Sequence, residues 1–114
     1  MKKLISFALI LFSTTSYAEY TPWAIPTNVA LVGSQGFRVV ASFGVPYNCE
    51  VPNQVFVSIN HPQYKEIYSM VLAAYASQSK IKFEVRKCGI IGWLSSSPIA
   101  ILDSSAAGDA QISK

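Results

Sequence analysis

Alternating apolar and polar residues predict three strands, because successive side chains of a strand point to opposite faces of a sheet. In the run 80–86 the odd-numbered residues are apolar and the even-numbered residues are charged. The run 37–43 likewise has apolar residues at its odd-numbered positions, which we expect in the core. In 54–59 we expect the odd-numbered residues up to Ile59 to point inward and Phe56 to point outward.

Three shorter apolar runs complete the predicted sheet. The run 28–32 is followed by the turn sequence GSQG at 33–36, which favours a hairpin with the strand at 37–43. Two further runs, 92–94 and 99–102, come after the charged alternation and are predicted to be its last strands.

The segment from Gln63 to Gln78 is predicted to be a helix, because its apolar residues recur every three or four positions. Asn60 and Pro62 just before it are typical of a helix start. The apolar stripe consists of Tyr64, Ile67, Tyr68, Val71, Leu72 and Tyr75. The opposite side has small side chains and few charges, whereas a solvated helix usually carries Lys and Glu. We therefore expect an interface with a second copy of the chain on this side, at Met70, Ala73 and Ser77.

The predicted fold is mainly β with one helix, in the order β-β-β-α-β-β. One helix between the third and fourth strands of a five-stranded unit is the order of the OB-fold, a partly open Greek-key barrel. A two-layer α+β sandwich fits the same pattern and stays open as an alternative.

Residues 1–18 have the composition of a secretory signal peptide: two lysines, an apolar run over 4–12, and small residues before a predicted cleavage after Ala18. The apolar run is too short to span a bilayer, so no membrane span is expected. We therefore expect one OB-like domain, 19–114, that is exported to the periplasm or secreted.

The two cysteines, Cys49 and Cys88, are predicted to form a disulfide, since an even count in a small exported domain reads as a structural bridge. A redox or metal pair would need close spacing or additional ligands, and the chain has a single histidine. We expect no metal and no cofactor.

The order of these segments resembles two groups of proteins. Residues 49–102 contain, in this order, a cysteine, a predicted strand, an Ala/Leu-rich predicted helix, a second predicted strand and a second cysteine. The first strand includes NQVFV at 53–57, the helix includes YSMVLAAYAS at 68–77, and the second strand includes KIKFEV at 80–85. This pattern resembles small exported bacterial proteins and the OB-fold B subunits of AB5 toxins, of the cholera and subtilase-cytotoxin type. The resemblance implies an OB-like fold and assembly of several copies into a ring. If the protein is like the toxin subunits, this ring is a pentamer. No sugar-binding motif of those subunits matches a residue here.

The candidate functional residues are aromatic rather than titratable. His61 beside Pro62 has no organised catalytic partner, and the acidic residues are scattered, so we expect no enzyme. Rings in loops or on outward strand faces suit sugar stacking or protein contact. They are Trp23, Tyr47, Phe56 and Trp93. Burial as plugs at the ends of the barrel is the alternative for both tryptophans.

Charge gives little indication of a partner. Removal of the signal segment lowers the formal net charge from +3 to +1, so no nucleic-acid partner is expected. The basic residues Lys80, Lys82 and Arg86 read as a solvated strand face. The sequence thus favours an exported, non-enzymatic binding module for a glycan or a protein surface. A monomeric or dimeric periplasmic inhibitor or interaction protein is the second hypothesis, and a small hydrolase is the third.

Overall fold

The computed structural model describes residues 19–92 and 94–114, so the predicted signal segment 1–18 and Trp93 lie outside the described residues. The α+β class is confirmed: the described part of the chain contains eight strands, one α-helix and one short 3-10 helix. These are β1 (Glu19–Tyr20), β2 (Asn28–Val32), β3 (Gly36–Val40), η1 (Pro46–Asn48), β4 (Gln54–Ser58), α1 (Tyr64–Ser77), β5 (Lys80–Val85), β6 (Lys87–Gly89), β7 (Ile99–Leu102) and β8 (Ala110–Ser113).

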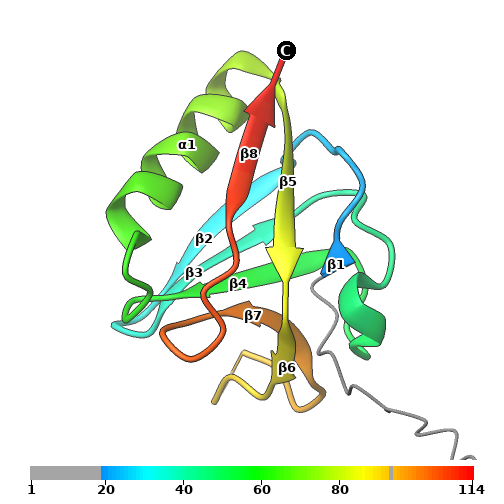
Figure 1. Cartoon of the computed structure of the whole chain (residues 1–114), viewed down its shortest axis with the longest axis vertical. Helices are drawn as coiled ribbons and strands as arrows, with labels where there is room; N and C mark the ends of the chain where they lie inside the picture. Colours follow the sequence, from blue (N-terminus) through cyan, green and yellow to red (C-terminus); the bar gives the residue numbers. More distant parts are fainter. Residues whose placement is uncertain (1–18, 93) are drawn as a thin grey trace, which may run out of the picture.

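The strands form two sheets rather than one closed barrel (Figure 1). The larger sheet has the order β2-β3-β4-β7-β6, in which β4 and β7 are parallel and the other neighbours are antiparallel. The smaller sheet, β1-β5-β8, is antiparallel and lies in front of it in Figure 1. Only Arg86 separates β5 from β6, so one extended segment contributes to both sheets.

The main core lies between the sheets and α1, which runs along one side of the molecule and contacts β2, β5 and β8. The predicted inward residues of the alternating runs fill it, because the odd-numbered residues of 37–43 and 81–85, together with Val55 and Val57, are all buried. The ring of Phe37 lies 5.5 Å from Tyr64 and 5.0 Å from Tyr68, centroid to centroid, and so joins β3 to the helix.

The prediction for Ile59 is wrong. The strand β4 ends at Ser58, and Ile59 is 54% exposed in the turn that follows.

The prediction that Phe56 points to solvent is also wrong. It does lie on the opposite face of β4 from Val55 and Val57, but it is only 1% exposed. A second apolar cluster covers it, formed by Val32, Ile91, Ile99 and Ile101 with Val51 and Leu94 at its edge. The connection between β6 and β7 therefore closes the outer face of the larger sheet at this point.

The helix is correctly predicted, but the side it buries is rotated from the predicted stripe. Its buried residues are Ile67, Val71 and Ala74, whereas Leu72 and Tyr75 are exposed. The helix begins at Tyr64 without a side-chain cap, and Asn60 instead accepts a hydrogen bond from the Ser104 amide.

Four further differences concern strands. Gly92 and Leu94 lie in a turn, so the strand predicted at 92–94 is wrong there. Strands β1, β6 and β8 are present although none was predicted. Each has two to four residues, which is too short for a periodic pattern to stand out.

The predicted disulfide between Cys49 and Cys88 is present, with the two Cα atoms 5.6 Å apart. It joins the segment before β4 to β6, where Cys88 pairs with Ala100 of β7. Cys49 is buried in the main core, and the bridge ties the segment before β4 to β6 across the larger sheet, to which both strands belong. A disulfide is compatible with an extracellular location.

Candidate functional site

Two exposed aromatic rings flank a lysine on the outer face of the smaller sheet. Tyr20 in β1 is 45% exposed and Trp23 just after it is 40% exposed. The Lys82 Nζ atom of β5 lies 4.7 Å from the Tyr20 ring centroid and 4.8 Å from that of Trp23. Both distances fall within the range of a cation–π interaction. We call Tyr20, Trp23 and Lys82 the aromatic–lysine cluster.

The cluster is positioned by backbone pairing of the segment 20–24 with β5. Tyr20 pairs with Glu84 in an antiparallel register, and Ala24 forms a bridge with Ile81. Since Ile81 points into the core, its neighbour Lys82 points outward, between the two rings. The strand alternation thus places the lysine.

Polar groups surround the rings. The Tyr20 hydroxyl donates a hydrogen bond of 3.3 Å to Asp109 Oδ2, and Gln111 of β8 pairs with Lys82. Partial burial, followed by the negative charges of Asp109 and Glu84, raises the pKa of the Tyr20 hydroxyl above its usual range. Glu84 is itself paired with Arg86, at 3.2 Å between Oε2 and Nη2.

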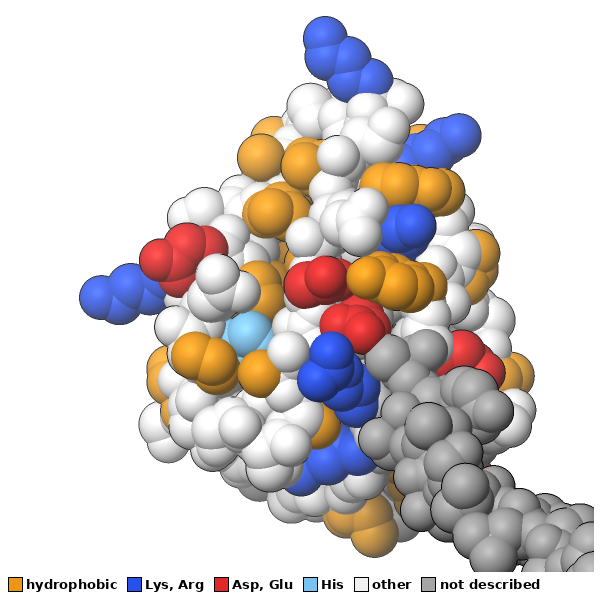
Figure 2. Space-filling model, viewed as in Figure 1, with side chains coloured by type: hydrophobic (Ala, Val, Ile, Leu, Met, Phe, Trp, Pro, Cys, Tyr) orange, Lys and Arg blue, Asp and Glu red, His pale blue; other side chains and the backbone are white. Residues whose placement is uncertain are grey.

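Positive and negative side chains are therefore balanced around the rings. Figure 2 shows hydrophobic, basic and acidic side chains next to one another on the face over β5 and β8. An ammonium, a carboxylate, an amide and a phenol beside flat apolar surface can hold a ligand that has hydroxyl groups on one side and C–H groups on the other. The balance of charge does not favour a strongly charged ligand.

Of the three predicted aromatic residues that the structure describes, only Trp23 belongs to this cluster. Phe56 is buried and is withdrawn as a binding residue, and Trp93 lies outside the described residues. Tyr47 is half-buried against the main core, and its amide donates a 3.0 Å hydrogen bond to Glu19 Oε1. It has a left-handed backbone conformation, with φ of 55°. Its contacts therefore anchor the segment around the disulfide.

Sequence reasoning missed Tyr20 and read Lys82 only as part of a solvated row. The spacing of Tyr20 and Trp23, three residues apart near the start of the domain, is visible in the sequence. Their meeting with Lys82 depends on the register between β1 and β5, which the sequence does not display.

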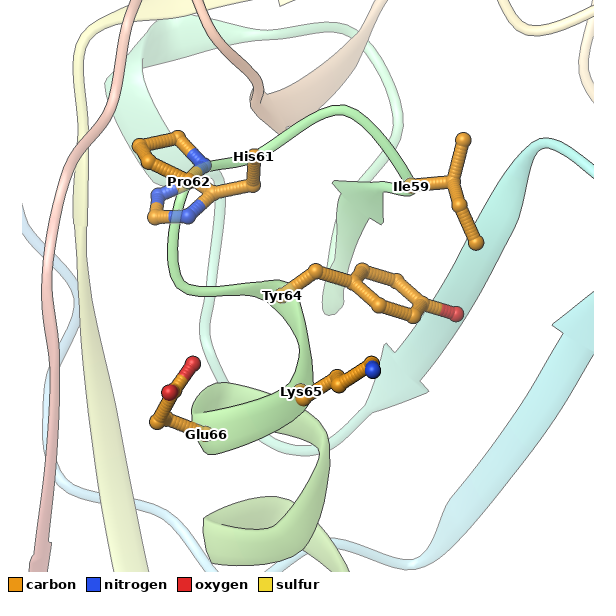
Figure 3. A pocket seen from close by; sticks show the side chains of 6 residues that line it. All are labelled: Ile59, His61, Pro62, Tyr64, Lys65 and Glu66. Carbon is orange, nitrogen blue, oxygen red and sulfur yellow. The ribbon is translucent and has the colours of Figure 1, made fainter.

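A concave region of about 370 Å³ lies at the start of α1 (Figure 3). It is lined by Ile59, His61, Pro62, Tyr64, Lys65 and Glu66. Figure 3 shows Tyr64 and Lys65 projecting to one side of the helix and Glu66 to the other. Polar groups that diverge in this way do not surround a common ligand atom.

His61 has a structural role in this region. It is buried, its Nδ1 atom accepts a 2.9 Å hydrogen bond from the Gln63 amide, and its Nε2 atom lies 3.0 Å from the Gly108 carbonyl oxygen. The Nε2–H tautomer satisfies both contacts, because that nitrogen then donates to the carbonyl. Both ring nitrogens are thus committed to holding the start of α1 against the loop before β8.

The residues predicted for an interface between copies differ in exposure. Met70 is half-buried and packs against the main core, while Ala73 and Ser77 are exposed. The outer surface of α1 is therefore centred closer to Ala73 than to Met70.

Within residues 19–92 and 94–114, no group of three or more His, Cys, Asp or Glu side chains is arranged to hold a metal ion. No helix in that part of the chain is long and apolar enough to cross a membrane. No protein-family model, curated protein or solved structure matches the chain. The resemblance to toxin B subunits therefore stays a prediction.

Proposed function

We propose that this protein is an exported, non-catalytic binding module that recognises a glycan through the outer face of the β1-β5-β8 sheet. One observation carries the proposal: two exposed rings flank Lys82 beside the hydrogen-bonding groups of Asp109 and Gln111. A sugar ring presents a C–H face that packs on an indole and hydroxyl groups that pair with carboxylate, amide and ammonium groups. The commitment of His61 to two structural contacts supports the non-catalytic part.

We also propose that the framework is a variant of the OB-fold. The sheet order β2-β3-β4-β7, with β4 and β7 parallel, and the helix between β4 and β5 support this relationship. In this variant α1 and β8 lie between the edge of β2 and β5. OB-folds bind oligosaccharides on the face of their second and third strands, which correspond to β3 and β4 here, so the fold supports the ligand class but not the position of the site.

A protein ligand is the second candidate. Exposed Trp and Tyr side chains beside charged groups also match the composition of a protein interface. This function corresponds to the inhibitor or interaction protein that the sequence left open.

The test is a glycan array, followed by calorimetry on the glycans that bind. Trp23→Ala should weaken binding by about 1 to 3 kcal/mol, because the ring loses its contact area. Tyr20→Phe, which keeps the ring and removes the hydrogen bond to Asp109, should cost about 1 kcal/mol. Leu31→Ala is the matched control: Leu31 is 63% exposed but lies in β2, away from the cluster, and its loss should leave binding unchanged.

Two results would contradict the proposal. One is a glycan that binds with equal affinity to the wild type and to Trp23→Ala. The other is a folded protein that binds no glycan but captures a protein in a manner that depends on Trp23, which would favour the second candidate.

A further inference from the structure

His61 is the single histidine of the chain, and it is buried, with 4% of its surface exposed. Its ring joins two parts of the fold that are far apart in the sequence. The Gln63 amide at the start of α1 donates to Nδ1 at 2.9 Å, and Nε2 lies 3.0 Å from the Gly108 carbonyl oxygen in the loop before β8. Both contacts require the neutral ring with its proton on Nε2, because Nδ1 accepts a hydrogen bond only when it carries no proton.

Protonation of the ring is incompatible with the contact to Gln63. The imidazolium has an N–H group at both nitrogens, so the new proton on Nδ1 points at the amide hydrogen of Gln63. The Gly108 side has no room to adjust, because even a Cβ atom there would collide with the Glu84 carbonyl oxygen of β5. The next residue, Asp109, is held in place as well, since its carbonyl accepts a 2.8 Å hydrogen bond from the Glu84 amide. The charged ring or the start of α1 must therefore move.

The concave region at the start of α1 gives the charged ring a place to move to. His61 lines this region together with Tyr64, Lys65 and Glu66. Figure 3 shows the Glu66 side chain on the same side of the helix start as the His61 ring, with Tyr64 and Lys65 on the other side. A ring that turns outward exchanges its two backbone contacts for water and for the Glu66 carboxylate, which pairs with an imidazolium but not with a neutral ring as strongly.

The other charged groups near the ring belong to β5 and to the loop before β8. Glu84 is paired with Arg86 at 3.2 Å, and the Asp109 side chain is exposed. Asp109 attracts a proton only across solvent, where salt screens the interaction. The Gln63 amide, in contrast, is in direct contact with Nδ1, so this contact determines which form of the ring fits the inward position.

We propose that His61 is a pH-sensitive latch, in which the neutral ring holds the start of α1 to the loop before β8 and the protonated ring releases it. An imidazole in an unfolded chain is neutral above about pH 6.5, so the latch is closed there. As the pH falls below that value, the outward ring takes up a proton more readily than the inward ring, and the stability that the closed latch contributes is lost. The latch does not depend on the proposed glycan function.

Nuclear magnetic resonance tests the latch in the wild type, because a single histidine gives ring signals that need no separation from others. In a titration from about pH 8 to pH 4, the Gln63 amide signal should shift with the same midpoint as the ring signals. The protection of that amide against hydrogen exchange should fall about threefold to tenfold, as expected for the loss of one hydrogen bond. A ring that titrates without a change at Gln63, or a ring that stays neutral at about pH 4, would overturn the proposal.

Three substitutions separate the latch from a general effect of charge. Glu66→Gln removes the carboxylate that receives the charged ring, and it should lower the midpoint by about 0.3 to 0.7 pH units. Lys65→Gln is the matched control, since Lys65 is also exposed but lies on the other side of the helix start, and it should leave the midpoint unchanged. Equal and opposite shifts in these two variants would overturn the outward position beside Glu66.

His61→Asn keeps an acceptor near the position of Nδ1 and has no ring to protonate. In this variant the protection of the Gln63 amide should stay constant over the same pH range. A loss of protection in acid as large as that of the wild type would show that another group controls this contact, and the latch would be refuted.

Discussion

Removal of the Cys49–Cys88 bridge should destabilise the domain severely. The bridge closes a loop with a sequence separation of 39 residues. The chain-entropy relation gives a contribution of about 4 kcal/mol for a loop of that length, since the cross-link restricts the unfolded chain. For a domain of this size, 1 kcal/mol corresponds to about 4 to 8 °C in melting temperature, so the loss is about 15 to 30 °C.

The measurement is thermal unfolding by circular dichroism of the variant Cys49→Ala/Cys88→Ala beside the wild type. Addition of reductant should lower the melting temperature of the wild type by a similar amount and leave the double variant unchanged. Cys49 lies in the main core, so its replacement also removes packing contacts and the loss should not fall below the loop estimate. A decrease of under about 5 °C would refute the loop-closure reasoning.

Two further substitutions test the burial and the charge of named side chains. Phe56→Ala should lower the free energy of unfolding by about 3 to 5 kcal/mol in urea, because the ring is buried in the second cluster; a loss below about 1 kcal/mol would contradict that burial. Asp103 is partly buried, which alone would raise its pKa, but hydrogen bonds from Lys87, Ser105 and the Ala106 amide outweigh this and hold the pKa below its usual range. Asp103→Asn should therefore cost about 1 to 3 kcal/mol at pH 7. The difference should shrink as the pH falls below about 4, because the unfolded chain then takes up a proton at Asp103 more readily than the folded protein does; a difference constant from pH 7 to pH 3 would contradict this.

The strands that sequence predicts well are those with a strict period of two and a buried face. In 80–86 every inward position is apolar and every outward position is charged, so one short stretch determines both the element and its orientation. The same logic fails at Ile59, because a turn begins after Ser58 and the alternation no longer describes the side-chain direction.

Residues covered by distant segments are harder to predict. Phe56 lies on the outer face of β4, as alternation requires, but the connection between β6 and β7 folds over it. Nothing near Phe56 in the sequence indicates that cover. The helix face shows a similar limit: Ala74 is buried in place of Leu72 because the positions of β2, β5 and β8 determine which side of α1 meets the core.

The sequence indicates which residue types could form the candidate site, but not which of these residues come into contact in the fold. Trp23 stands out as a ring in a Pro-interrupted segment, and Lys82 as an outward residue of a strand. Their contact depends on the pairing of two segments about sixty residues apart, and β1 is too short to show a pattern. Tyr20 joins the site through that same pairing.

The attachment of the first described residues to β5 links local stability to recognition. Four hydrogen bonds hold Thr21 and Ala24 there. The two amides donate to the Phe83 and Ile81 carbonyls at 2.9 and 3.0 Å, the Ala24 carbonyl accepts from the Ile81 amide at 2.8 Å, and the Thr21 hydroxyl accepts from the Phe83 amide at 3.0 Å. Local unfolding of this edge segment would carry both rings away from Lys82 while β5 stayed paired with β8. The apparent affinity for any ligand of the cluster is therefore its intrinsic affinity multiplied by the fraction of molecules in which the segment is attached.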